Sequence, residues 1–90
     1  MTTIAEWYKV DGAHIAQSLN EVREKLGSTE GEAVVDFSSV ERLDTAGLQE
    51  LDKLAGAAEE KSAKVTLRGV NVGIYKVLKL ARLTARFSYH

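Results

Sequence analysis

The 90-residue sequence contains no cysteine and no proline. Without cysteine, a disulfide framework, a thiol nucleophile and cysteine-ligated zinc are all excluded, and we expect a protein of the reducing cytoplasm. Without proline, the chain has no Pro-rich linker or ligand motif. Its longest stretch free of Asp, Glu, Lys and Arg is nine residues, from Gly12 to Asn20. A membrane span needs about 20 apolar residues, so we expect no membrane insertion.

The remaining composition is that of an average soluble domain, with 44% hydrophobic and 28% charged residues. At this length we expect a single domain covering residues 1–90. The net charge of −1 conceals an uneven distribution, because residues 61–90 carry seven basic residues and no acidic one, whereas residues 1–60 carry five basic and 13 acidic residues. Either this asymmetry attracts an acidic partner or an anionic lipid face, or folding mixes the charges locally.

The hydrophobic pattern predicts alternating strands and helices. Apolar residues at Ile15, Leu19, Val22 and Leu26 follow steps of four, three and four, which predicts a helix with one buried face. The run Ala33–Val35 is typical of a strand covered on both faces. Such patterns predict strands near residues 3–10, 33–37, 65–68 and 87–90, alternating with helices near residues 13–26, 45–61 and 72–81. We therefore expect the α/β class: a mostly parallel or mixed four-stranded sheet with three to four helices.

In an open parallel sheet, binding sites lie beyond the carboxyl ends of the strands, where loops lead into helices. That rule selects two junctions, residues 36–48 and residues 69–75. In the second, Gly69 and Gly73 are four residues apart, but the further glycine and the Lys-Ser/Thr pair of a phosphate-binding loop are missing. We predict a turn there and a helix capped by Asn71, with a small nucleotide-binding or enzymatic domain as the minor alternative.

Few residues of the chain are of the types that carry catalysis. His14 and His90 have no nearby serine and carboxylate in a readable nucleophilic motif, so we predict that the protein is not an enzyme. The carboxylates Asp36, Glu41 and Asp44 are of a type that binds Mg²⁺, yet their spacing matches no ligand loop. We therefore predict neither a metal nor a cofactor, and expect turn-forming or helix-capping roles for Asp36 and Asp44.

Basic residues recur three or four positions apart over the third predicted helix and just beyond it: Lys76, Lys79, Arg82 and Arg86. This spacing suits the tracking of phosphates, but no aromatic platform for bases interleaves the cations. We predict a solvated helix face here and no direct contact with nucleic acid.

The junction over residues 36–48 is the strongest candidate site. It places Asp44 and Thr45 at the start of the second predicted helix, where Asp44 can accept hydrogen bonds from free backbone N–H groups. Gly47 follows in the first turn, where glycine costs helix stability, so we expect another backbone, from this chain or from a partner, to approach closely. Thr45 would be an exposed hydroxyl, and its phosphorylation would add about −1.5 to −2 charges without disturbing the fold. The simpler interpretation is an unmodified, capped helix start.

This junction resembles the signature of the STAS domain, a family named for sulphate transporters and anti-sigma-factor antagonists. The family pattern is an apolar strand ending in Asp-x-Ser, followed by Asp-Ser/Thr-x-Gly-Leu; here it reads Val34–Ser38 and Asp44–Leu48. Val65–Gly69 and Val77–Leu83 are similar to the next strand and helix of the family. The resemblance implies a non-enzymatic module that binds proteins through a surface formed by Asp36, Ser38, Asp44, Thr45, Ala46, Gly47 and Leu48.

The resemblance implies two alternative roles. In transcription regulation, an anti-sigma factor that is a serine-threonine kinase phosphorylates the hydroxyl after the Asp, here Thr45, and phosphorylation releases the kinase. An anti-sigma-factor antagonist of this type is our leading interpretation. In the other branch, a small STAS subunit of lipid-asymmetry ABC transporters binds the ATPase subunit, and Thr45 would be an unmodified contact.

The sequence differs from the family pattern at its beginning. Most members open with a two-strand hairpin, whereas only one strand is recognisable before Ala13. Because an exposed sheet edge invites pairing with another chain, we expect that this STAS-like fold, lacking part of the usual hairpin, forms a homodimer through its N-terminal segment.

Overall fold

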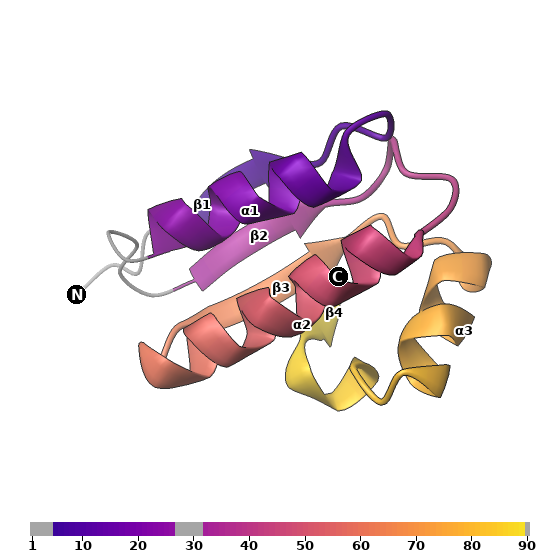
Figure 1. Ribbon diagram of the computed structural model, residues 1–90. Helices are drawn as coiled ribbons and strands as arrows, with labels where there is room; N and C mark the ends of the chain where they lie inside the picture. The colour runs from indigo at the N-terminus through magenta and orange to yellow at the C-terminus, as the bar shows by residue number, and fades with distance from the viewer. Residues whose placement is uncertain (1–4, 27–31, 90) are drawn as a thin grey trace.

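Four strands alternate with the helices along the chain, as the hydrophobic pattern predicts. The computed structural model describes residues 5–26 and 32–89 (Figure 1). Its elements are β1 (Ala5–Lys9), α1 (Ile15–Lys25), β2 (Glu32–Asp36), α2 (Thr45–Glu60), β3 (Lys64–Arg68), α3 (Val72–Leu80), the 3₁₀ helix η2 (Thr84–Arg86) and β4 (Ser88–Tyr89). The first two residues of the predicted first strand, the predicted helix stop at Gly27 with the polar loop after it, and His90 lie outside the described residues.

The four strands form one parallel sheet in the order β1-β2-β3-β4. Each crossover therefore joins neighbouring strands, and right-handed crossovers in that order place the connecting helices on one face. Figure 1 shows α1 and α2 side by side in front of the sheet, with α3 at the end of the helix layer. The fold is thus a two-layer α/β arrangement whose second sheet face carries no helix among the described residues.

β2 is buried on both faces, as its apolar run predicts, although helices cover only one of the two faces among the described residues. Val34 lies on the helix-free face, in register with Trp7 of β1 and Thr66 of β3. It is nevertheless only 6% exposed, and Thr66 only 5%, because central strands are shielded by the side chains of both neighbours. Trp7 stands at the edge of this face, 58% exposed, and the guanidinium of Arg68 lies 5.0 Å from its ring centre.

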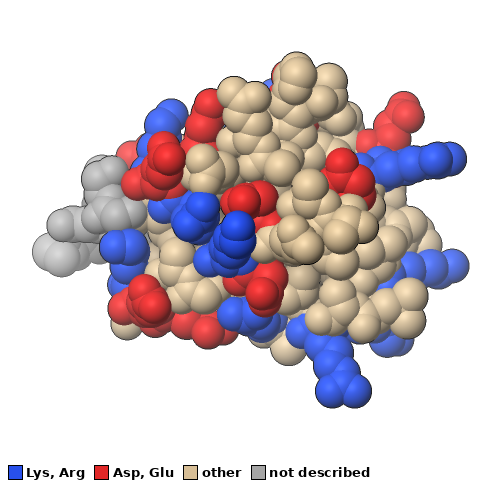
Figure 2. All heavy atoms as spheres, in the orientation of Figure 1, with Lys and Arg blue, Asp and Glu red and all other residues tan. Residues whose placement is uncertain are grey.

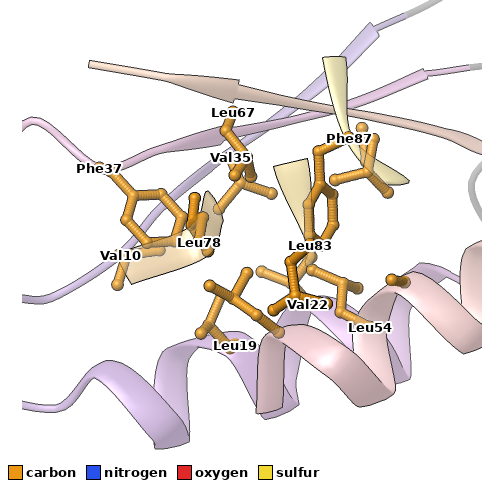
Figure 3. Close-up of a cluster of buried hydrophobic side chains, with 14 of the residues drawn as sticks. Val10, Leu19, Val22, Val35, Phe37, Leu54, Leu67, Leu78, Leu83 and Phe87 are labelled. Atoms are coloured by element: carbon orange, nitrogen blue, oxygen red, sulfur yellow. The ribbon is translucent and has the colours of Figure 1, made fainter. Parts of the chain in front are cut away.

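A single hydrophobic core fills the space between the sheet and its helices (Figure 3). Val35 and Leu67 point from the sheet towards Leu19 of α1 and Leu54 of α2, and Leu78 of α3 joins the same cluster. All five side chains are essentially inaccessible to solvent. Each such side chain stabilises the fold by about 1.5–3 kcal/mol relative to an exposed position.

Two helix ends lie at the margin of the core. Leu48, in the first turn of α2, is half-buried and packs against the core. The third helix was predicted to reach residue 81, but α3 ends at Leu80 and Ala81 is exposed. Beyond it the backbone turns sharply at Arg82, which adopts a φ of 61°. No helix in the described part of the chain is long and apolar enough to cross a membrane.

Folding pairs some of the basic residues between positions 61 and 90 with acidic residues from earlier in the chain, and leaves others unpaired among the described residues. The guanidinium of Arg86 lies 2.6 Å from the carboxylate of Asp52 and 3.1 Å from that of Glu59, both on α2. The ammonium of Lys64 likewise lies 3.7 Å from the carboxylate of Glu32. Figure 2 shows red and blue side chains interspersed over most of this face, whereas the cations at the lower right, around α3, have no acidic neighbours.

Candidate functional site: a docking platform at the start of α2

The loop from β2 to α2 is held in place by its first residues. The backbone N–H of Phe37 donates to the carbonyl of Arg68 at 2.7 Å, which extends the β2–β3 pairing by one residue. The N–H of Val40 then donates to the carbonyl of Phe37 at 2.9 Å and closes a turn. Because the side chains of Phe37 and Val40 are both buried, the loop is anchored to the core at two points.

Asp36 stabilises the same loop through its carboxylate. Oδ1 of Asp36 accepts a hydrogen bond from the backbone N–H of Ser38 at 2.9 Å. Hydrogen bonds from Ser38 lower the pKa of Asp36, with smaller contributions from the positive charges of Arg68 and Lys9, against an opposing effect of burial. Asp36 is in register with Lys9 and Arg68 on the sheet, so it forms the acidic centre of a charged row at the carboxyl ends of the strands.

The start of α2 has the predicted geometry. Asp44 is the N-cap, and its Oδ1 accepts a hydrogen bond from the backbone N–H of Gly47 at 2.7 Å. Thr45 and Ala46, the first two helical residues, are exposed. The hydroxyl-bearing residue therefore stands at the positive end of a 16-residue helix, next to a small side chain that leaves the surface open.

Gly47 is required by close packing, but its neighbours differ from those expected. A Cβ at this position would lie 2.9 Å from Cγ2 of Ile15 and 2.9 Å from Cδ1 of Leu43. Both neighbours are side chains, so within this chain side chains, and not another backbone, approach Gly47; approach by the backbone of a partner stays a prediction. The glycine instead lets α2 begin directly against the first residue of α1.

Asn71 joins the second junction to the first, a role that the sequence did not reveal. Its Oδ1 accepts from the backbone N–H of Ile74 at 2.8 Å and caps α3, as predicted. Its Nδ2 donates to the carbonyl of Glu41 at 3.1 Å, and also lies 3.4 Å from the carbonyl of Val40. The side-chain amide of Asn71 therefore binds the loop after β2 and also caps α3. The local capping pattern in the sequence predicts only the second of these contacts.

Two glycines outside the predicted site also shape it. Gly69 adopts a φ of +72°, and a Cβ there would lie 3.0 Å from the backbone nitrogen of Ser38. A Cβ on Gly12 would clash with the backbone carbonyl of Ser39. The turns after β1 and β3 thus press against the loop after β2 from both sides. The sequence signals were the glycines themselves, which we interpreted only as turn residues.

The structure brings together part of the predicted contact surface. We call the exposed residues Asp44, Thr45 and Ala46, with the adjoining groove between the loop and α3, the docking platform. The groove has a volume of about 270 Å³ and is lined by Glu41, Arg42, Leu43, Gly73, Ile74 and Val77. Asp36 supports the loop from the helix-free side, Ser38 is exposed beside it, and Gly47 and Leu48 lie beneath the platform.

The described residues do not form a catalytic site around His14 or a metal site. His14 is exposed and immediately precedes α1. Asp36, Glu41 and Asp44 do not converge, and within residues 5–26 and 32–89 no three His, Asp or Glu side chains are grouped to hold a metal ion. What remains is a rigid, exposed helix start with a shallow groove, which is an arrangement suited to binding another protein.

Comparison with known families decides the relationship. Residues 9–86 match the family model described as "Mlab, STAS domain". The chain belongs to the STAS domain family. A relative with this domain is the intermembrane phospholipid transport system binding protein MlaB of Escherichia coli K12, which is 40% identical to this chain over 65 residues. That alignment covers 72% of this chain and 65% of the relative, slightly less than two thirds of its length; the Shigella flexneri protein of the same name matches equally.

Solved structures of low sequence identity share the STAS fold. A sulfate transporter family protein from Wolinella succinogenes superposes with a TM-score of 0.77 at 20% identity, covering 94% of this chain and 75% of that one. A Thermotoga maritima protein described as a candidate anti-sigma factor antagonist superposes with a TM-score of 0.67 at 15% identity, covering 99% of this chain and 74% of that one. These likenesses confirm the predicted fold class.

Proposed function

We propose that this STAS domain is a protein-binding accessory subunit of a phospholipid-transporting ABC transporter, and that it binds the ATPase subunit through the docking platform. The observation that carries this proposal is the exposed Asp44–Ala46 helix start, held rigidly on three packed turns. The 40% identity to a protein named for intermembrane phospholipid transport favours this branch of the family over the anti-sigma-factor antagonists. The preference reverses our leading interpretation of the sequence alone.

The platform is suited to rigid-body docking. The carboxylate of Asp44 already accepts a hydrogen bond from the N–H of Gly47, and Asn71 holds the neighbouring loop through the carbonyl of Glu41. Because these groups are already ordered, little conformational entropy is lost when a partner binds. Ala46 offers a flat contact, and the groove of about 270 Å³ beside it receives a side chain from the partner. Thr45 supplies a hydroxyl that both donates and accepts hydrogen bonds.

The test is a binding titration against the purified ATPase subunit of the phospholipid transporter from the same organism. Ala46→Arg places a long charged side chain on the platform, and we expect it to weaken binding by about tenfold or more, as for an interface hot spot. Gln17→Arg introduces the same charged side chain at an exposed position of α1 and serves as the control. Equal affinities for both variants and the unmodified chain, with unchanged circular dichroism, would contradict the proposal.

A second function, the anti-sigma-factor antagonist, is favoured by the position of Thr45. Its side chain is exposed at the N-terminus of α2, where a kinase can reach it and where helix ends attract anions. Asp44 opposes a phosphate electrostatically, so the phosphate would remain free to change what the platform binds. We expect Thr45→Glu to weaken binding to a serine-threonine kinase of this type and Thr45→Ala to retain it while abolishing phosphorylation. Unchanged affinity of both variants rejects the switch.

A further inference from the structure

Most of the exposed large hydrophobic side chains of the described residues belong to one short helix. Five large hydrophobic side chains are exposed, and three of them belong to α3: Val72 at 72%, Tyr75 at 44% and Leu80 at 86%. A fourth, Tyr89 of β4, packs its ring edge against Tyr75, with ring centres 5.4 Å apart. Single exposed apolar residues are ordinary, but a cluster of this kind marks an interaction surface.

Cations lie among these apolar side chains. Lys76, Lys79 and Arg82 are all exposed, and none of them forms an ion pair within the part of the chain that the structure describes. Together with Leu80 they line a shallow hollow of about 540 Å³. No acidic residue occurs between positions 61 and 90, so no negative charge from the same segment offsets them. Figure 2 shows blue side chains projecting at the lower right, where Figure 1 places α3.

The dipole of α3 accounts for only part of this arrangement. Positive charges near the end of a helix are favoured by about 0.3–1 kcal/mol, which is reason enough for Lys79 and Arg82 to occur there. It gives no reason for Leu80 and Val72 to remain exposed. The inner face of α3 already packs against the core through Ile74 and Leu78. The apolar and cationic side chains of the outer face are therefore not needed to hold α3 in the fold.

We propose that this α3 surface, consisting of Val72, Tyr75, Lys76, Lys79, Leu80 and Arg82, rests on an anionic phospholipid membrane. Charge complementarity requires an anionic occupant, and exposed Leu and Tyr interleaved with lysines are the composition of helices that lie in the membrane interface. Protein interfaces, by contrast, are depleted of lysine. Figure 1 shows α3 at the end of the helix layer, so a flat surface can approach its outer side.

This contact is separate from the function proposed for the docking platform. The groove of the platform is lined on α3 by Gly73, Ile74 and Val77, and none of these residues belongs to the α3 surface, whose hollow is lined by Lys76, Lys79, Leu80 and Arg82. Membrane binding is therefore measurable on the isolated chain, without the ATPase subunit or a kinase.

The first experiment is co-sedimentation of the whole chain with vesicles of phosphatidylcholine alone or mixed with phosphatidylglycerol. We expect partitioning only onto the anionic vesicles, weakened by added salt. The double variant Lys76→Glu/Lys79→Glu is expected to lower the partition coefficient by about tenfold or more. Lys53→Glu/Lys61→Glu, which changes the net charge equally on α2, is expected to have a much smaller effect. Equal losses for both double variants, or no preference for anionic vesicles, would overturn the proposal.

The second experiment tests contact at Leu80 directly. Because the chain has no native cysteine, Leu80→Cys and Gln17→Cys each provide a unique position for an environment-sensitive fluorophore. We expect a blue shift on adding phosphatidylglycerol vesicles for the label at position 80 and none at position 17. If the label at position 80 instead responds to polyglutamate and not to vesicles, the surface binds an acidic protein and the membrane assignment is overturned.

Discussion

The amide of Asn71 donates through Nδ2 to the backbone carbonyl of Glu41, at 3.1 Å, across 30 residues of sequence. The same side chain caps α3 through Oδ1. One side chain thereby holds the loop after β2 against the start of α3, and the groove of the docking platform lies between this loop and α3.

The two hydrogen-bonding roles of Asn71 are separable by substitution. Asn71→Ala removes the cap and the loop contact, and we expect it to lower the free energy of unfolding by about 1–2 kcal/mol. Asn71→Asp keeps the accepting oxygen but loses the donor, so its stability should lie between those of the alanine variant and the unmodified chain. Urea denaturation followed by circular dichroism measures both; equal stability of Asn71→Asp and the unmodified chain would mean that the loop contact contributes nothing.

The two glycines of α2 should respond oppositely to alanine. A Cβ at Gly47 lies 2.9 Å from side-chain atoms of Ile15 and Leu43, so Gly47→Ala is expected to lower the free energy of unfolding by about 1–3 kcal/mol. At Gly56 the nearest atom is Nη2 of Arg86 at 3.9 Å, an ordinary contact. Gly56→Ala should therefore stabilise the helix by about 0.5–1 kcal/mol. Thermal unfolding of both variants compares them, and stabilisation by both would show that α1 and α2 readily move apart.

The pKa of Asp36 predicts an acid-dependent part of stability. Hydrogen bonds from Ser38 lower this pKa below its ordinary value of 3.8. Between the folded and unfolded pKa values the unfolded chain binds more protons, so stability rises with pH there. The contribution is complete above the unfolded value and is lost as the pH falls through the folded one.

Asp36→Asn should remove this dependence. We expect the stability difference between the variant and the unmodified chain to be constant near neutral pH and to shrink below about pH 4. Denaturation over a series of pH values measures the difference, and carboxyl NMR titration reports the pKa of Asp36 directly. A titration midpoint at or above the ordinary value contradicts the interpretation.

Arg86 connects the segment before β4 to α2 through Asp52 and Glu59, at 2.6 Å and 3.1 Å. These hydrogen bonds raise the pKa of Arg86, Glu59 contributing most, so the side chain stays charged throughout the usual pH range. We expect Arg86→Ala to cost about 1 kcal/mol of unfolding free energy, less at high salt because both acids are exposed. Lys53→Ala, which loses only one pair on the same helix, is the control for denaturation at low and high salt.

The homodimer stays a prediction. β1 lies at one edge of the sheet and pairs only with β2 among the described residues. An unprotected edge of this kind offers hydrogen-bonding groups to a second chain. Light scattering over a concentration series should show a mass near twice the 9.9 kDa of one chain; a monomer at the highest concentration rejects the dimer.

Local patterns in the sequence determined the order of elements and both helix caps. Asp44 and Asn71 each precede an apolar helical face by a fixed interval, so their acceptors meet backbone N–H groups of the same segment. The spacing of Leu19, Leu54 and Leu78 likewise selected the faces that meet in the core. Such features need only neighbouring residues, which is why they were predictable.

The tertiary structure alone decided which distant residues touch. Gly69 presses on Ser38, Asn71 holds Glu41, and Gly47 admits Ile15, all through contacts between segments that no periodicity relates. The sheet order also left one face without a helix from residues 5–26 or 32–89, because each crossover joins neighbouring strands with the same hand. Sequence could name the exposed hydroxyl of Thr45, but only packing made its surroundings rigid.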